Sequence, residues 1–219
     1  MERAAAVDRV LRLIETIDTQ PTPVPIREVW VLGDLALGLD PVDRLDIYVR
    51  KELLFTAEEP DYDPAAEEKF VDEFGIQGIG KAVSARWSTA FPESIRTNDH
   101  GHAAPERCLA AFLLPPDEPI HLEICNAGFE QNVMQRIQTA VARERFEQIL
   151  DPRGVCIWKD GITSETAPNK LREGEYIFPP LAEALQSLGM DADLAELAAD
   201  AVGQWREDTQ GTSHRADVL

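Results

Sequence analysis

The sequence contains few cysteines, few lysines and no long hydrophobic run. Its three cysteines, Cys108, Cys125 and Cys156, form no C-x-x-C pair, so we expect small buried thiols rather than a disulfide framework. No apolar run approaches the roughly 20 residues that span a bilayer, and the N-terminus lacks the pattern of a signal peptide. The sequence therefore predicts a cytoplasmic protein without membrane segments.

Positive charge is also scarce. The chain has 40 acidic residues against 21 basic ones, a formal net charge of −19, and the acids are spread along its whole length. An acid-rich, lysine-poor chain of this kind resembles the cytoplasmic proteins of salt-accumulating halophilic archaea; the alternative is an ordinary acidic protein. Because net negative charge opposes contacts with phosphate backbones, nucleic acid is not an expected partner.

What the sequence does have is enough apolar residues, 44%, to form a hydrophobic core. Periodicity predicts helices over 2–18, 65–74, 128–150, 180–188 and 192–207, and strands over 27–32, 45–54, 82–87, 108–114, 120–125 and 155–158. We expect a hairpin-like connection at 115–119, a polar loop at 159–175 and frayed residues at 208–219. This order predicts an α+β fold with one mixed β-sheet and flanking helices. Residues 1–150 would form its core and 151–219 a small, mostly helical extension.

The most informative stretch is a strand, a turn with two glycines and a second strand. The first strand ends at Gly33, the turn continues through Asp34 to Gly38, and the second strand carries Asp46 near its start. This layout resembles the nucleotidyltransferase superfamily, whose signature is a strand, a Gly-Ser or Gly-Gly turn and an Asp-x-Asp or Asp-x-Glu strand. The resemblance covers the topology of residues 3–150 and implies a nucleotide at Gly33, Asp34 and Gly38.

The resemblance also implies catalytic and metal-binding carboxylates. Two-metal nucleotidyl transfer needs acids that hold two divalent ions roughly 4 Å apart, and residues i and i+2 of a strand share a face. Asp46 takes the first position and Glu123 is the candidate third acid, with Mg²⁺ as the implied cofactor. The second position holds Tyr48, and Asp34 replaces the serine that touches phosphates in the family. These two departures predict that standard two-metal catalysis is absent.

A solvent-facing position is the alternative for both acids. Asp46 would then be an ordinary acid at a strand end, and alternation would place Glu123 on a wet face.

A second candidate site is a histidine-rich loop. His100 and His102 could place two imidazoles on one metal, and Asp99 or Cys108 could complete a tetrahedral zinc site. No second Cys or His pair follows at zinc-finger spacing, so an ordinary polar loop is the alternative.

Two helices carry further surface predictions. The arginines of the long helix, Arg136, Arg143 and Arg145, are expected on a solvated charged face. The apolar stripe over 194–205 either packs on its own domain or forms a homodimer or partner surface.

Three hypotheses follow. The first is a nucleotidyltransferase-like module that binds a nucleotide or a protein without catalysis. The second is an active, divergent Mg²⁺-dependent nucleotidyltransferase using Asp46, Glu123 and Asp34. The third is a structural or regulatory oligomer without a small-molecule ligand. Convergence of Asp46 and Glu123 on one cleft beside Gly33 would be required for the second.

Overall fold

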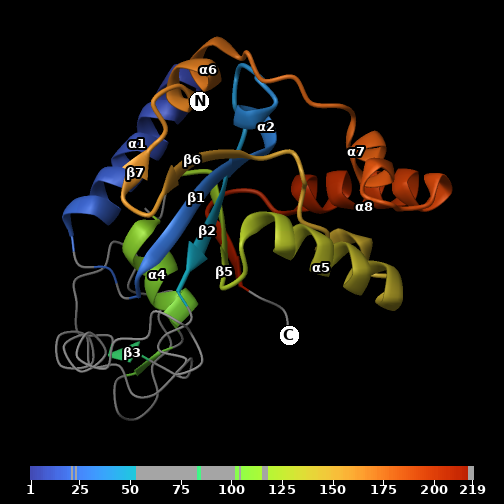
Figure 1. Cartoon of the computed structure of the whole chain (residues 1–219), viewed down its shortest axis with the longest axis horizontal. Coiled ribbons are helices and arrows are strands. Elements are labelled where there is room, and N and C mark those ends of the chain that lie inside the picture. Colours follow the sequence, from blue (N-terminus) through green and yellow to red (C-terminus); the bar gives the residue numbers. More distant parts are fainter. Residues whose placement is uncertain are drawn as a thin grey trace.

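The protein is built around a six-stranded mixed sheet with helices on both faces, which confirms the predicted α+β class (Figure 1). The computed structural model describes residues 1–20, 22, 24–52, 83–84, 102–103, 105–114 and 118–216. The strands of the sheet, in spatial order, are β7 (Ile162–Thr163), β6 (Val155–Lys159), β1 (Ile26–Leu32), β2 (Leu45–Lys51), β5 (Ile120–Cys125) and β8 (Ser213–Ala216). A separate two-stranded sheet pairs β3 (Val83–Ser84) with β4 (His102–Ala103).

The pairing within the large sheet changes once from antiparallel to parallel, at β2. β1 pairs antiparallel with β2 and β6, whereas β2, β5 and β8 run parallel to one another. Parallel neighbours need a crossover connection, and a long stretch containing α4 (Pro105–Leu113) links β2 to β5. The result places β8, the last strand of the chain, beside β5 at one edge of the sheet.

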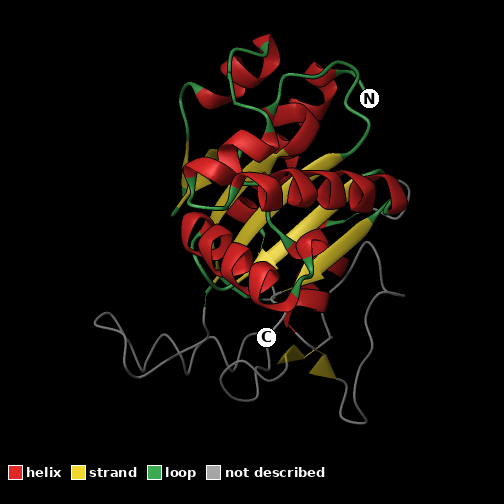
Figure 2. Cartoon of the chain, turned by 90° about the vertical axis from the view of Figure 1, so that its right-hand side faces the viewer, coloured by secondary structure: helices red, strands yellow, loops and turns green. Residues whose placement is uncertain are grey.

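Two hydrophobic cores form, one on each face of the sheet. α1 (Arg3–Thr19), α4 and α6 (Ala167–Glu173) contribute to the first core, together with the short helix α2 (Gly33–Ala36). α5 (Phe129–Arg143), the 3₁₀ helix η2 (Phe146–Gln148), α7 (Leu181–Ser187) and α8 (Ala192–Asp208) contribute to the second. Figure 2 looks onto this second layer and shows its helices crossing in front of the strands. The candidate site lies on that face.

The predicted strand over 108–114 is wrong. These residues form most of α4, and the expected hairpin therefore does not exist. A short apolar run fits a buried helix as well as a buried strand. Pro105 at the first helical position, Glu106 in the first turn and the alanines at 110 and 111 favour the helix.

The C-terminal third holds more regular structure than predicted. The expected loop over 159–175 contains β7 and α6, and the residues expected to fray include β8. The long helix predicted over 128–150 ends at Arg143, where Glu144 adopts a left-handed conformation. The other strands and helices among the described residues begin and end close to their predicted positions, while the predictions for 65–74 and most of 82–87 lie outside those residues.

The stripe on the last helix packs largely on its own domain. Ala198 and Val202 are buried in the second core, whereas Leu197 is 57% exposed.

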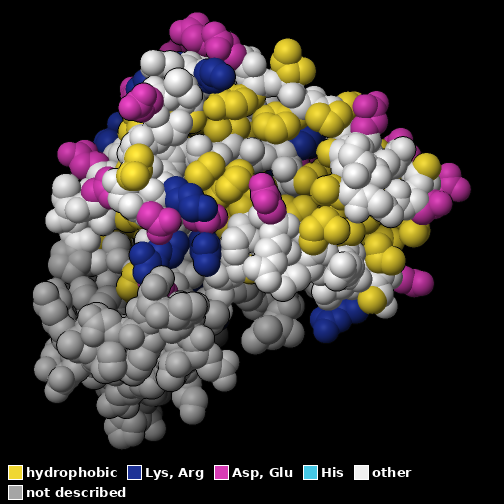
Figure 3. All heavy atoms as spheres, viewed as in Figure 1, with side chains coloured by type: hydrophobic (Ala, Val, Ile, Leu, Met, Phe, Trp, Pro, Cys, Tyr) yellow, Lys and Arg dark blue, Asp and Glu magenta, His cyan; other side chains and the backbone are white. Residues whose placement is uncertain are grey.

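None of the described helices combines the length and hydrophobicity needed to cross a bilayer. Acidic side chains are spread around the visible face rather than gathered in one patch (Figure 3).

Candidate functional site

Gly33 begins the turn that follows β1, and the geometry there requires a glycine. Its φ is +59°, in the left-handed region. A Cβ at this position would lie 2.4 Å from Oδ2 of Asp46 and 2.8 Å from Nη2 of Arg206. The glycine therefore allows an aspartate and an arginine to approach the backbone of the turn.

We expect Gly33→Ala to lower the free energy of unfolding by about 2–3 kcal/mol, because it combines a strained φ with a steric clash. Urea denaturation measures the change. Gly161→Ala is the control, since Gly161 also has a positive φ, +82°, but a Cβ added there would meet no atom within 4 Å. Equal losses in the two variants would show that the approach of Asp46 and Arg206 to Gly33 is unimportant.

Sheet register places the candidate acids on one face. Asp46 is opposite His121, and Tyr48 is opposite Glu123, in adjacent parallel strands. Because paired residues and i, i+2 neighbours share a face, all four side chains project from the same side of the sheet. Asp46 is 5% exposed and Glu123 is 2% exposed, so the solvent-facing alternative is wrong for both.

Asp46 belongs to a buried cluster of two aspartates and two arginines. Arg44 Nε donates to Asp46 Oδ1 at 2.9 Å, and Arg206 Nη2 donates to Asp46 Oδ2 at 2.8 Å. The same Arg206 nitrogen lies 2.8 Å from Asp34 Oδ1. Asp34 Oδ2 also accepts from the backbone N–H groups of Asp43 and Arg44. The carboxylate of Asp34 is thus neutralised within the protein rather than turned toward a phosphate.

Glu123 belongs to a second buried cluster, which contains three cationic or titratable partners. Arg215 Nε donates to Glu123 Oε1 at 2.6 Å, and Arg136 Nη2 donates to Oε2 at 3.0 Å. His121 Nε2 lies 3.2 Å from Oε1, and its Nδ1 lies 2.8 Å from the hydroxyl of Ser213. Burial raises the pKa of Glu123, but Arg215, His121 and Arg136 together outweigh it and hold the pKa below its ordinary value. Glu123 is therefore ionised.

The two clusters meet at one small cavity. Asp46, Glu123 and Gly33 all line a space of about 30 Å³, together with side chains from the C-terminal residues Trp205, Arg206 and Arg215. The two acids therefore line one cavity beside the Gly33 turn, which is the arrangement that the catalytic hypothesis requires. The space holds about one water molecule, because arginines fill the remainder.

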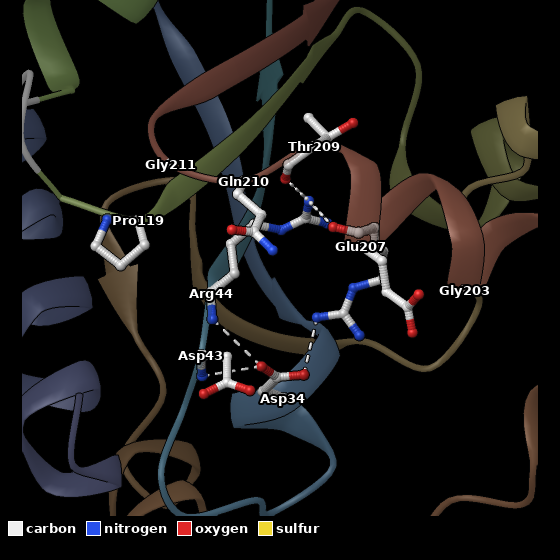
Figure 4. Close-up of a pocket in the computed structure, with 10 residues that line it drawn as sticks. Asp34, Asp43, Arg44, Pro119, Gly203, Glu207, Thr209, Gln210 and Gly211 are labelled. Atoms are coloured by element: carbon white, nitrogen blue, oxygen red, sulfur yellow. Dashed lines mark hydrogen bonds and ion pairs between the residues drawn. The ribbon is translucent and has the colours of Figure 1, made fainter.

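A larger cavity of about 570 Å³ lies next to it (Figure 4). Asp34, Asp43, Arg44 and Pro119 line one side, and Gly203, Arg206, Glu207, Thr209, Gln210 and Gly211 line the other. Figure 4 shows the Asp34 carboxylate in the lower part of the view, with dashed lines to the backbone of residues 43 and 44. The Arg206 guanidinium donates to Oδ1 of the same carboxylate.

Tyr48 does not act as a substitute metal ligand. It is fully buried, and its hydroxyl donates to the carbonyl of Ala127 at 2.6 Å and accepts from Asn132 at 3.3 Å. Its ring packs edge-on against Phe129, 5.3 Å between centroids. The position at which the nucleotidyltransferase pattern has its second carboxylate is therefore part of the hydrophobic core in this protein.

The remaining predicted site residues lie elsewhere. Gly38 accepts a hydrogen bond from Arg3 and contacts the backbone of Gly174, away from both cavities. His102 lies in β4, and His100 lies outside the described residues. Within the described part of the chain, no three His, Cys, Asp or Glu side chains are grouped to hold a metal.

Sequence reasoning missed the arginines that neutralise the acids. Arg136 was expected on a solvated face but is 8% exposed and pairs with Glu123, whereas Arg143 and Arg145 are exposed as predicted. Helical spacing offered one signal: Arg136 and Val133 are three residues apart, so Arg136 borders the buried stripe. No local signal marked Arg206 or Arg215, which lie 160 and 92 residues from the acids that they contact.

Comparison with known proteins gives a family. The sequence matches a family of unknown function, DUF7095, over residues 2–219. The chain belongs to this family. The match includes the acids of β2 and β5 and the arginines of the C-terminal segment. No curated protein and no solved structure matches the chain.

Proposed function

We propose that this DUF7095 chain is a cytoplasmic, nucleotidyltransferase-like module that binds a nucleotide without standard two-metal catalysis. One observation carries the proposal: Asp46 and Glu123 are each ion-paired with two arginines. A two-metal site needs carboxylates that are available to divalent ions. Here guanidinium groups pair with those carboxylates, and the second carboxylate position of the nucleotidyltransferase pattern holds the buried Tyr48.

The two buried clusters hold one more arginine than acids. Four arginines, Arg44, Arg136, Arg206 and Arg215, surround three acids, Asp34, Asp46 and Glu123. The cluster therefore carries a net charge of +1, from 4 − 3, in a chain whose net charge is −19. This surplus belongs to the buried clusters, because the lining of the larger cavity holds Asp34, Asp43 and Glu207 against Arg44 and Arg206. A phosphate would therefore be held by direct contact with an arginine rather than by the net charge of the cavity.

The larger cavity supplies the space. A volume of about 570 Å³ falls within the range of roughly 300–1,000 Å³ that is typical of small-molecule sites. Arg206 contacts both aspartates through Nη2. Since a guanidinium has five N–H donors, its other nitrogens can bind a phosphate at the cavity wall. Asp43 and Glu207 line the same cavity, so we expect nucleoside monophosphates and diphosphates to bind better than triphosphates.

Calorimetric titration with nucleoside mono-, di- and triphosphates tests the proposal, in molar KCl to screen the acidic surface. We expect binding that EDTA does not abolish and that Arg206→Gln weakens by about tenfold or more. Arg172→Gln is the matched control, because Arg172 pairs with the exposed Asp8 outside the site. If no nucleotide binds, the proposal is wrong.

An active Mg²⁺-dependent nucleotidyltransferase is the second candidate. It is favoured by the convergence of Asp46 and Glu123 on one cavity beside Gly33. Incubation with labelled nucleoside triphosphates and Mg²⁺ distinguishes the two. We expect no label transfer; transfer that Asp46→Asn abolishes would establish the enzyme instead.

A further inference from the structure

The end of the chain covers the buried acids. Residues 205–216, here termed the C-terminal strap, comprise the last turn of α8, a short link and β8. The strap crosses from the second helical layer back to the sheet, where β8 pairs with β5 in parallel over four residues. It supplies Arg206 to Asp46 and Arg215 to Glu123.

Polar and cationic contacts hold the strap in place. Two guanidinium groups lie over the Trp205 ring, with Cζ of Arg215 4.5 Å and Cζ of Arg44 5.2 Å from its centroid. Its edge also meets His121, with 5.1 Å between ring centroids. Arg44 Nη1 donates to the carbonyl of Thr209 at 2.7 Å. These contacts all involve Trp205 or the guanidinium group of Arg44.

The strap contributes little to the hydrophobic cores. None of residues 205–215 is buried, whereas all six residues of the neighbouring β5 are. The 570 Å³ cavity also lies between the strap and the body of the protein, so Gln210 and Gly211 bridge a hollow instead of packing on a surface. Docking of this segment therefore depends on ion pairs rather than on apolar burial.

A segment held mainly by ion pairs can detach while the rest of the protein stays folded. Buried ion pairs give little net stability, because desolvation offsets most of their attraction. Cation–π contacts add about 0.5–2 kcal/mol each, and a four-residue edge strand adds few backbone hydrogen bonds. Segments with few buried apolar contacts open locally at a much lower free energy than the global value.

We propose that residues 205–216 form a releasable strap whose undocking opens the cavity of Asp46 and Glu123 to solutes. In the docked state, Arg206 and Arg215 occupy the space beside the acids. In the undocked state, the acids face water and exchangeable ligands. The docked strap thus reversibly blocks access of solutes to Asp46 and Glu123. This role is additional to the nucleotide binding proposed above.

Hydrogen exchange followed by mass spectrometry on the ligand-free, full-length chain tests the strap. In the wild-type protein, we expect amides of 209–216 to exchange at least tenfold faster than those of β1 and β2. Equal protection of the strap and these central strands would overturn the proposal. Because the measurement uses no nucleotide, its outcome is independent of whether a nucleotide binds.

Variants test the role of the arginines. Arg206→Gln and Arg215→Gln should each speed exchange over 209–216 by a further tenfold and leave β1 unchanged. Arg172→Gln should change neither region. Uniformly faster exchange across the whole protein would show that the arginines stabilise the global fold, and it would overturn the proposal. A variant that fails to fold would also contradict the proposal, because the strap would then be needed for the global fold. The wild-type exchange measurement does not depend on the variants.

Discussion

Replacing Glu123 with alanine is expected to lower the free energy of unfolding by about 3–5 kcal/mol. The change removes the buried carboxylate that pairs with both Arg136 and Arg215. Urea denaturation followed by circular dichroism measures the change in the free energy of unfolding. Asp8→Ala is the control, because Asp8 is exposed and pairs with Arg172 outside the site, and we expect a change within about 0.5 kcal/mol there. Similar losses in both variants would contradict the role of Glu123.

The same ion pairs predict a pH dependence. The pKa of Glu123 is held below its unfolded value of 4.5, against the effect of burial, by Arg215, His121 and Arg136. A depressed carboxylate pKa stabilises the folded protein fully above the unfolded pKa, and this contribution is lost as pH falls toward the folded pKa. Wild-type stability should therefore fall more steeply below pH 4.5 than that of Glu123→Ala. Parallel curves would contradict this.

Restoring the carboxylate of the family pattern by Tyr48→Asp is expected to destabilise the protein by at least about 4 kcal/mol. The substitution removes a fully buried aromatic ring that packs against Phe129. It also places a carboxylate opposite the carbonyl of Ala127, which now accepts the tyrosine hydroxyl. Because proteins of this size are stable by only about 5–15 kcal/mol, much of the variant should be unfolded at room temperature.

Tyr48→Phe separates the ring from its hydroxyl. It keeps the packing and loses only the hydrogen bonds to Ala127 and Asn132, so we expect a loss of about 1–2 kcal/mol. Thermal or urea unfolding compares the two variants. If Tyr48→Asp is as stable as Tyr48→Phe, the position tolerates a metal ligand, and the case against two-metal catalysis weakens.

The clusters explain how a strongly acidic chain can keep a group of arginines at one site. Among the described residues, all acids except Glu28, Asp34, Asp46 and Glu123 are exposed or half-buried, where water and salt screen them. The arginines of the site are instead held against buried acids by the sheet and by the C-terminal strap. A ligand that enters the larger cavity meets the Arg206 side chain before it can reach the acids behind it.

The sequence by itself determined the strands that carry the acids, the glycine turn and the class of the fold. Strands β1 and β2 are short apolar runs, and Gly33 marks a left-handed turn, so local patterns suffice. The resemblance also implied that Asp46 and Glu123 lie together, because it assigns them to neighbouring strands with both side chains on the same face of the sheet. The helix α4 was missed because a seven-residue apolar run has no distinguishing period.

Only the tertiary structure decided what surrounds those acids. Arg206 and Arg215 reach them from the end of the chain, and β8 exists because β5 offers an edge with which to pair. Four residues without a hydrophobic pattern carry no local preference for a strand, so their structure comes from the partner strand. Ion pairing between residues so far apart in sequence follows from topology, because charge alone does not specify which acid an arginine will meet. That arrangement turns an apparent metal site into a set of buried arginine–carboxylate pairs.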